Sequence, residues 1–120
     1  QKCIIARKGE NIVHYSWLTP HCEYADEIEQ VITLEEDENY LYNCRTLSEA
    51  RGKGIFPAVI GRALQEAASA GVSRVKAVVT RKNRPSLRAF EKMLFRVHEE
   101  LSVKRFLFLR KHHTIRCTGY

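Results

Sequence analysis

Residues 51–56, with the sequence RGKGIF, join an apolar strand-like segment to an alanine-rich helix-like segment. The two glycines remove side chains from a turn, so backbone N–H groups can come close to a ligand. The helix that follows directs its unpaired N–H groups and the positive end of its dipole at the same place. Since Arg51 and Lys53 add positive charge, the stretch predicts a phosphate-binding turn; the alternative is an ordinary glycine turn before a helix.

The segments around this turn predict a mixed α/β order. We expect a hairpin, an acidic loop with a short strand, a strand before the turn, a helix after it, a buried strand, a second helix opened by Pro85, and a final strand pair. The alternation of strand 40–47 places Tyr40, Tyr42, Cys44 and Thr46 on one face. The expected strands are 2–7, 12–19, 31–34, 40–47 and 75–80, with a helix over 56–70 and the strand pair within 96–110.

The composition fits one soluble domain. The chain has 120 residues, 44% hydrophobic and 28% charged, and no apolar run long enough to span a membrane. Residues 1–44 hold three Lys/Arg and nine Asp/Glu, a net charge of −6, whereas residues 45–120 hold 17 and five, a net charge of +12. A basic half attracts polyanions, or it is simply a solvated face.

The four cysteines lack a C-x-x-C pair, and the adjacent pairs His21-Cys22 and His112-His113 lack the spacing of zinc ligands. We therefore expect reduced, mostly buried thiols and no metal.

A second polar segment follows the buried strand. Asn83 and Ser86 bracket the start of the helix that Pro85 opens, and they either cap it or face a ligand between the two strand–helix units. Arg81, Lys82, Arg84 and Arg88 add positive charge around them.

Together the two segments resemble the GNAT superfamily of N-acetyltransferases. Residues 51–56 match the family's acetyl-CoA signature R/Q-x-x-G-x-G/A except at Phe56. Residues 83–95 match N-x-x-S/A-x-x-x-Y/F-E-K-x-G-F, with Leu94 at the usual glycine. The resemblance covers residues 38–96, and both motifs lie on the expected elements.

The resemblance implies an α/β (α+β) fold with a mixed, mostly antiparallel sheet, splayed at strands 40–47 and 75–80, and helices on both faces. Acetyl-CoA would be the cosubstrate, with its pantetheine arm between the splayed strands and its pyrophosphate on the N–H groups of residues 52–56. The implied cofactor-binding residues are Arg45, Thr46, Arg51, Gly52, Lys53, Gly54, Ile55, Phe56, Asn83, Ser86 and Phe90.

The catalytic groups are less well marked. Many relatives carry, at the position of Phe90, a tyrosine that protonates the leaving thiolate; Tyr40, Tyr42 and Cys44 are conceivable substitutes. An alkylammonium acceptor must also lose a proton before it attacks a thioester. The acidic segment supplies Glu36 and Glu35 as candidate catalytic bases, and His14 is another candidate; the alternatives are a solvated loop and a structural histidine.

The sequence thus predicts one domain, 1–120, that lacks the N-terminal strand and helices with which the family usually begins; these elements are either upstream, supplied by another chain, or missing. Its function would be direct transfer of an acetyl group from acetyl-CoA to an amine of a small molecule or peptide. A non-catalytic acyl-CoA-binding or regulatory domain is the first alternative, and a basic nucleic-acid-binding module is the second. We expect a cytoplasmic monomer or homodimer that binds neither nucleic acid nor membrane.

Overall fold

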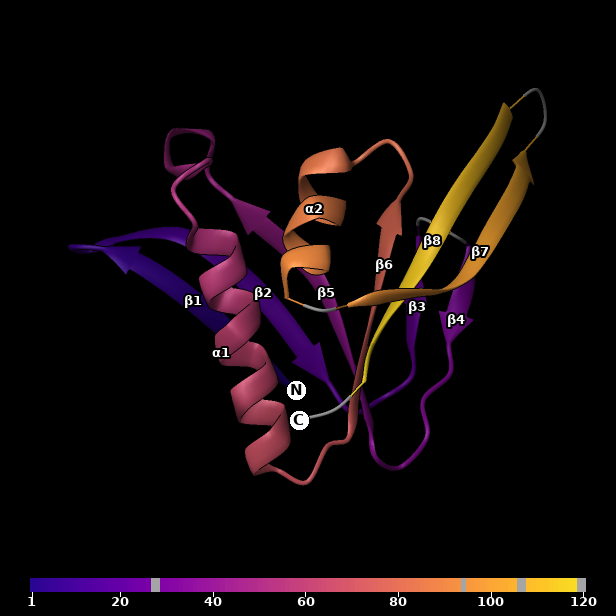
Figure 1. Cartoon of the computed structure of the whole chain (residues 1–120), viewed down its shortest axis with the longest axis horizontal. Coiled ribbons are helices and arrows are strands. Elements are labelled where there is room, and N and C mark those ends of the chain that lie inside the picture. The colour runs from indigo at the N-terminus through magenta and orange to yellow at the C-terminus, as the bar shows by residue number, and fades with distance from the viewer. Residues whose placement is uncertain (27–28, 94, 106–107, 119–120) are drawn as a thin grey trace.

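A computed structural model of the chain describes residues 1–26, 29–93, 95–105 and 108–118. Within these residues, eight strands, a 3-10 turn and two α-helices follow one another in the order that the sequence predicts, with one additional short strand (Figure 1). Their bounds are β1 Lys2–Lys8, β2 Asn11–Thr19, β3 Glu23–Ala25, β4 Gln30–Ile32, β5 Glu38–Thr46, η1 Ser48–Ala50, α1 Ile55–Ser69, β6 Arg74–Thr80, α2 Arg84–Lys92, β7 Arg96–Arg105 and β8 Phe108–Thr118.

The main sheet has six strands in the order β1-β2-β5-β6-β8-β7. The β5–β6 pair is parallel and the other neighbouring pairs are antiparallel. Strand β8 lies between β6 and β7 and runs to Thr118, beyond the predicted end of the final strand pair at residue 110. A mixed, mostly antiparallel sheet with two helices confirms the predicted fold class.

The parallel strands separate halfway along their length. Pairing between β5 and β6 runs from Glu38 opposite Arg74 to Leu41 opposite Ala77, while β5 continues to Thr46 and β6 to Thr80. Beyond Leu41 the two strands diverge, which confirms the predicted splay (Figure 1). Backbone groups on the diverging ends are therefore available to something other than the neighbouring strand.

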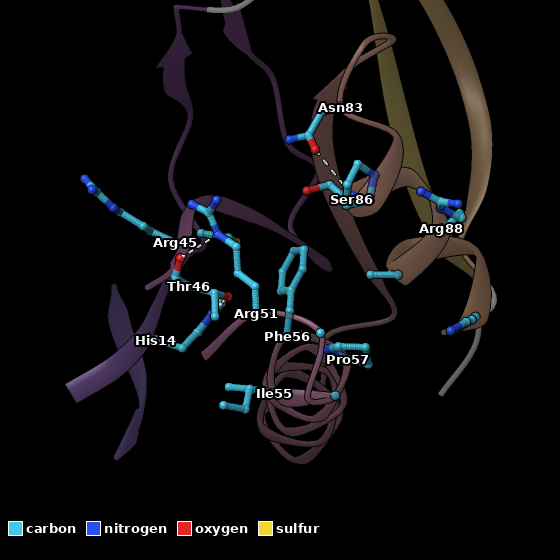
Figure 2. A pocket seen from close by; sticks show the side chains of 16 residues that line it. His14, Arg45, Thr46, Arg51, Ile55, Phe56, Pro57, Asn83, Ser86 and Arg88 are labelled. Atoms are coloured by element: carbon cyan, nitrogen blue, oxygen red, sulfur yellow. Dashed lines mark hydrogen bonds between the residues drawn. The ribbon is translucent and has the colours of Figure 1, made fainter. Parts of the chain in front are cut away.

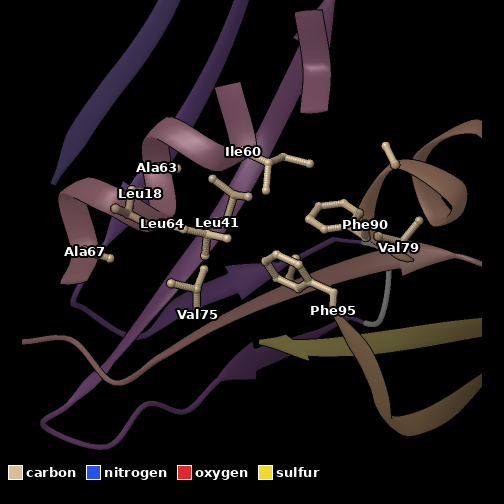
Figure 3. Packing of buried hydrophobic residues seen from close by; sticks show 12 residues of the cluster. Leu18, Leu41, Ile60, Ala63, Leu64, Ala67, Val75, Val79, Phe90 and Phe95 are labelled. Atoms are coloured by element: carbon tan, nitrogen blue, oxygen red, sulfur yellow. The ribbon is translucent and has the colours of Figure 1, made fainter. Parts of the chain in front are cut away.

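The main core lies between the sheet and both helices. Ile60, Ala63, Leu64 and Ala67 of α1 pack in one buried cluster with sheet residues and with the Ala89 and Phe90 side chains of α2 (Figure 3). Because Ala63 is fully buried, α1 sits close to the strands. The sheet residues of the cluster are Leu18, Leu41, Val75, Ala77 and Val79.

The two helices cover the same face of the sheet, which differs from the expected arrangement with helices on both faces. On the opposite face, β3 and β4 form a small separate hairpin, and Ala25 and Ile32 pack there against Tyr40. The predicted strand at 31–34 is β4 of this hairpin. A short hairpin thus covers part of the face where a second layer of helices was expected.

A β-bulge changes the faces of strand β5. Tyr15 pairs with Arg45 but Trp17 pairs with Tyr42, so Asn43 and Cys44 together lie opposite one residue of β2. Asn43 takes a positive φ of 49°, a conformation that Asn tolerates. The prediction that Cys44 shares a face with Tyr40 and Tyr42 is wrong, because the bulge turns Cys44 to the helix side, where it packs against the main core.

The cysteines also differ from expectation. Cys3 and Cys22 are exposed and Cys44 is half-buried, so the expectation of mostly buried thiols is wrong for the first two. The side chain of Cys117 lies outside the described side chains. Neither α1 nor α2 is long and apolar enough to cross a membrane.

Candidate functional site

A cavity of about 750 Å³ opens at the end of β5, above the start of both helices (Figure 2). The splayed strand, the glycine turn and the first turns of α1 and α2 each contribute to its wall. The lining residues are His14, Cys44, Arg45, Thr46, Arg51, Gly52, Gly54, Ile55, Phe56, Pro57, Asn83, Pro85, Ser86, Arg88, Ala89 and Lys92.

The glycine turn leaves the N-terminus of α1 open. Gly52 and Gly54 have φ values of 74° and 76°, which side-chain-bearing residues rarely adopt. Gly54 is the N-cap of α1 and provides no side-chain hydrogen bond, so the first N–H groups of the helix have no partner within it. Arg51 Nε donates to the Thr46 carbonyl at 3.1 Å and ties the turn to β5. The open N–H groups and the helix dipole make this turn suited to an anion.

The N-terminus of α2 faces the same cavity but is closed. The Asn83 side chain is the N-cap and accepts a hydrogen bond from the Ser86 N–H at 3.3 Å. Pro85 occupies the first turn, where its missing N–H costs nothing. Asn83 therefore caps its helix, which confirms the first of the two alternatives, and it also lines the cavity.

The wall of the cavity is cationic. Arg45, Arg51, Arg88 and Lys92 line it, and the described lining residues include no Asp or Glu. Arg88 and Lys92 are four residues apart on α2 and therefore lie on one face of that helix. The electrostatic potential of such a wall favours a ligand with several negative charges.

A smaller cavity of about 210 Å³ lies between the diverging strands. It adjoins the first, because Cys44, Phe56, Asn83 and Ser86 line both. Its other lining residues are Tyr40, Leu41, Tyr42, Asn43, Ala77, Val78, Val79, Thr80 and Phe90. Its small volume and its place between two strands suit a slender chain.

His14 lies beneath the cavity and is almost completely buried, with 1% of its surface exposed. Nδ1 is 2.5 Å from the Thr46 hydroxyl and Nε2 is 2.7 Å from the Ser16 hydroxyl, and the ring stacks on Phe56 at 5.4 Å. Burial lowers the pKa of His14 to about 4, so the ring is neutral at neutral pH. A neutral imidazole accepts at one nitrogen and donates at the other.

Most of the predicted cofactor-binding residues come together at this site. Lys53 lines neither cavity, and Phe90 lines the smaller one. The residues that do line the large cavity are Arg45, Thr46, Arg51, Gly52, Gly54, Ile55, Phe56, Asn83 and Ser86.

The predicted catalytic carboxylates lie elsewhere. Glu35 and Glu36 line neither cavity, because they precede β5 and the cavities lie toward the other end of that strand. Their neighbour Glu38 is buried and pairs with Lys76 at 2.9 Å and Arg74 at 3.5 Å, so it anchors the start of the parallel strand pair.

Sequence reasoning missed several lining residues. Pro57, Ala89 and Lys92 were not among the expected site residues, although the helical spacing of Pro85, Ala89 and Lys92 in the printed sequence gives one face of α2. Among the side chains that the structure describes, no group of three or more His, Cys, Asp or Glu gathers as a metal site would require.

Known proteins share this architecture. The model of the acetyltransferase (GNAT) family matches residues 2–95. An acetyltransferase of the GNAT family from Streptococcus pneumoniae has a TM-score of 0.76 at 12% identity, over 97% of this chain and 65% of that one. Salmonella typhimurium yncA, solved with its cofactor acetyl-CoA, has a TM-score of 0.75 at 14% identity, over 95% of this chain and 62% of that one.

A third structure, the ribosomal-protein-alanine N-acetyltransferase from Brucella melitensis, has a TM-score of 0.74 at 17% identity. The match covers 95% of this chain and 66% of that one. The chain thus spans less than two thirds of the length of these three proteins. No protein with a curated description matches the sequence. The family match extends over more than half of the chain and includes the glycine turn and both helices, and on this ground the chain belongs to the acetyltransferase (GNAT) family.

Proposed function

We propose that the protein is an acetyl-CoA-dependent N-acetyltransferase that moves the acetyl group directly to an amine. One observation carries the proposal: the uncapped N-terminus of α1 opens onto a cation-lined cavity that continues between two splayed strands. A ligand with several phosphates at one end and a slender arm at the other matches both cavities. At about 750 Å³, the large cavity lies within the range of small-molecule sites.

Each part of acetyl-CoA has a chemically suited partner in this arrangement. The N–H groups after Gly54 would hold the pyrophosphate, since they lack partners within α1. Pro57 contributes no N–H, which reduces the donors at this turn by one. The backbone of β5 near Arg45 and Thr46 would pair with the amide groups of the pantetheine arm, because β6 no longer pairs with it there.

Direct transfer is favoured over an acetyl-enzyme intermediate. Cys44 is the one cysteine among the described residues that line the cavities. Burial raises the pKa of its thiol to about 11, against the lowering effect of a hydrogen bond from Ser16. The thiolate is the nucleophilic form of cysteine. Because Cys44 is protonated at neutral pH, it is a poor nucleophile for attack on a thioester. An incoming amine then reacts with the thioester itself.

Calorimetry with acetyl-CoA, followed by a thiol-release assay over a panel of amines, tests the proposal. We expect the wild type to bind acetyl-CoA and Gly54→Trp to lose binding, because the indole would occupy the mouth of the turn. Gly9→Trp is the matched control: Gly9 also has a positive φ and no atom within 4 Å of an added Cβ, but it lies in the β1–β2 turn and lines neither cavity. Equal affinity in Gly54→Trp and Gly9→Trp would refute the pyrophosphate site.

A non-catalytic acyl-CoA-binding domain is the second candidate, and Phe90 favours it. Phe90 is 3% exposed and packs edge-on against Phe56 and Phe95, at ring distances of 5.6 and 4.8 Å. No hydroxyl exists there to protonate a leaving thiolate. Binding of acetyl-CoA without thiol release from any amine would support this candidate against the enzyme.

A further inference from the structure

The β3–β4 hairpin turns a pair of apolar side chains outward. Ala25 and Ile32 are buried against the main sheet, whereas Tyr24 and Val31 are 57% and 55% exposed. Tyr24 and Val31 are direct cross-strand partners, so their side chains lie together on the outer face of the hairpin. They are the two most exposed of the large apolar side chains that the structure describes. An exposed apolar pair in one place points to a contact surface, which single scattered apolar residues do not.

Acidic side chains flank this apolar pair along the chain. Residues 20–37 include seven Asp or Glu and no Lys or Arg. Asp26, Glu35 and Glu36 are exposed, and none of the Lys or Arg side chains that the structure describes forms an ion pair with them. The two cations near the start of β6 are held by the buried Glu38. We call this apolar pair with its three exposed acids the hairpin surface; its members are Tyr24, Asp26, Val31, Glu35 and Glu36.

Neither cavity offers comparable negative charge. The described residues that line the two cavities include no Asp or Glu, so their side chains give an alkylammonium group no opposite charge. A small amine would depend on these walls alone for its recognition. A larger acceptor can be held outside the cavities, on a surface whose charge complements its own.

The hairpin sits on the wall of the smaller cavity. Its buried residue Ile32 packs in one cluster with Tyr40, Tyr42 and Val78, and these three residues line the smaller cavity. The hairpin covers the face of the sheet away from α1 and α2, whereas the cationic cavity lies above the start of those helices. A ligand on the hairpin surface therefore approaches the gap between β5 and β6 from the side opposite to the cationic wall.

The hairpin also has free backbone edges. β3 and β4 form a two-stranded sheet apart from the main one, so in the described part of the chain each has a strand neighbour on one side only (Figure 1). The N–H and C=O groups of such an edge can pair with an added extended chain. A polypeptide can use these backbone groups together with the apolar pair, and a small amine cannot.

We propose that the hairpin surface docks a basic segment of a polypeptide acceptor. An apolar residue of that segment lies against Tyr24 and Val31, and its cations lie beside the flanking carboxylates. The proposal rests on the proposed function, and it narrows the acceptor from amines in general to the amines of proteins or peptides. It gives Glu35 and Glu36 a role in acceptor binding instead of proton transfer.

Fluorescence anisotropy tests the docking without any cofactor. The probe is a labelled, unstructured peptide of lysine, leucine and serine residues. Tyr24→Thr/Val31→Thr should weaken its binding about tenfold or more, because the change removes most of the apolar contact, while threonine keeps the β propensity of both positions. Ile5→Thr/Ile12→Thr is the matched control, since it removes two exposed apolar side chains from the β1–β2 hairpin that line neither cavity.

The charge of the hairpin surface is tested with the same probe. Glu35→Gln/Glu36→Gln should weaken binding about fivefold at low ionic strength and less at high salt, because exposed ion pairs are weak and screened. Glu10→Gln/Glu49→Gln is the matched control, since both residues are exposed, lie outside the hairpin surface and give the same change in net charge. A peptide with glutamate in place of each lysine should not bind.

Three results would overturn the docking of a basic segment. The first is a wild type that does not bind the lysine peptide, and the second is equal affinity in the hairpin variants and their matched controls. The third is a wild type that is dimeric by light scattering and becomes monomeric in Tyr24→Thr/Val31→Thr, because the surface would then belong to a second copy. If the peptide binds as expected but the protein releases no thiol from acetyl-CoA with any amine, the proposed function fails while the docking surface stands.

Discussion

The N-termini of α1 and α2 face the same cavity, yet a side chain caps α2 and no side chain caps α1. At α2 the Asn83 side chain accepts the Ser86 N–H, and the helix satisfies its own donors. At α1 the N-cap is Gly54, which has no side chain to offer, and its φ of 76° holds the turn open. A ligand anion therefore gains more at α1, where it supplies the missing acceptors, than at α2, where it would compete with Asn83.

The first turn of α1 is held by packing instead of a cap. Phe56 stacks on His14 and meets Phe90 edge-on, so the turn is anchored to β2 and α2 through aromatic rings. Such packing fixes the backbone without using its N–H groups. The comparison suggests a division of roles, in which α1 binds the anion and α2 supplies a rigid second wall.

The largest effect should come from giving α1 a negatively charged residue where it now has glycine. Gly54→Asp should weaken acetyl-CoA binding by at least about 100-fold, because the carboxylate takes up the N–H groups and repels phosphate. Gly54→Asn is the matched control, since Asn also tolerates a positive φ but carries no charge, and it should lose less affinity. Calorimetry measures both, and equal losses in Asp and Asn would contradict the electrostatic account of this N-terminus.

Low pH should destabilise the packing of His14 against Phe56, which holds the first turn of α1 in the absence of a side-chain cap. Burial lowers the pKa of His14 from 6.5 to about 4, so below pH 6.5 the unfolded chain takes up a proton that the folded protein refuses. The free energy of unfolding then falls as the pH drops from 6.5 to 4, by at most about 1.4 kcal/mol per pH unit from this group. Urea unfolding across this range should show the slope in the wild type and a shallower one in His14→Phe. Parallel curves would contradict the buried, neutral state of His14.

The smallest effect should come from removing the cap that α2 has. Asn83→Ala should cost about 1 kcal/mol of unfolding free energy, the usual value of an N-cap. Its affinity for acetyl-CoA should fall less than tenfold, far less than in Gly54→Asp. Urea unfolding and calorimetry measure the two quantities, and a loss of affinity as large as that of Gly54→Asp would mean that α2 holds the anion.

The elements of the fold could be predicted because their signals are local. Hydrophobic periodicity, the alanine-rich face and the glycines around Lys53 are each visible within a few residues, and the observed bounds of α1 and β6 differ from the predicted ones by one residue. The face of the sheet that each helix covers could not be predicted in this way. Nothing within either helix tells which face of the sheet it covers, and here both pack into one cluster.

The surroundings of the candidate site could not be predicted because they depend on register between distant segments. The His14–Thr46 contact joins residues 32 positions apart, and it exists only through the pairing of β2 with β5 and the bulge at Asn43. Nearness in sequence is also not nearness in space: a strand of nine residues spans about 26 Å, so Glu35 and Glu36 lie near the start of β5, whereas the large cavity lies at its other end.

The amide groups of the two helix N-termini test the central claim most directly. In a titration of the ¹⁵N-labelled protein with acetyl-CoA, followed by two-dimensional NMR, we expect large downfield shifts for the N–H groups of Gly54, Ile55 and Phe56, which would gain phosphate acceptors. We expect little change for the N–H of Ser86, which already bonds Asn83. A larger shift at Ser86 than at the α1 amides, or no shift at either helix, would contradict the claim that α1 holds the anion.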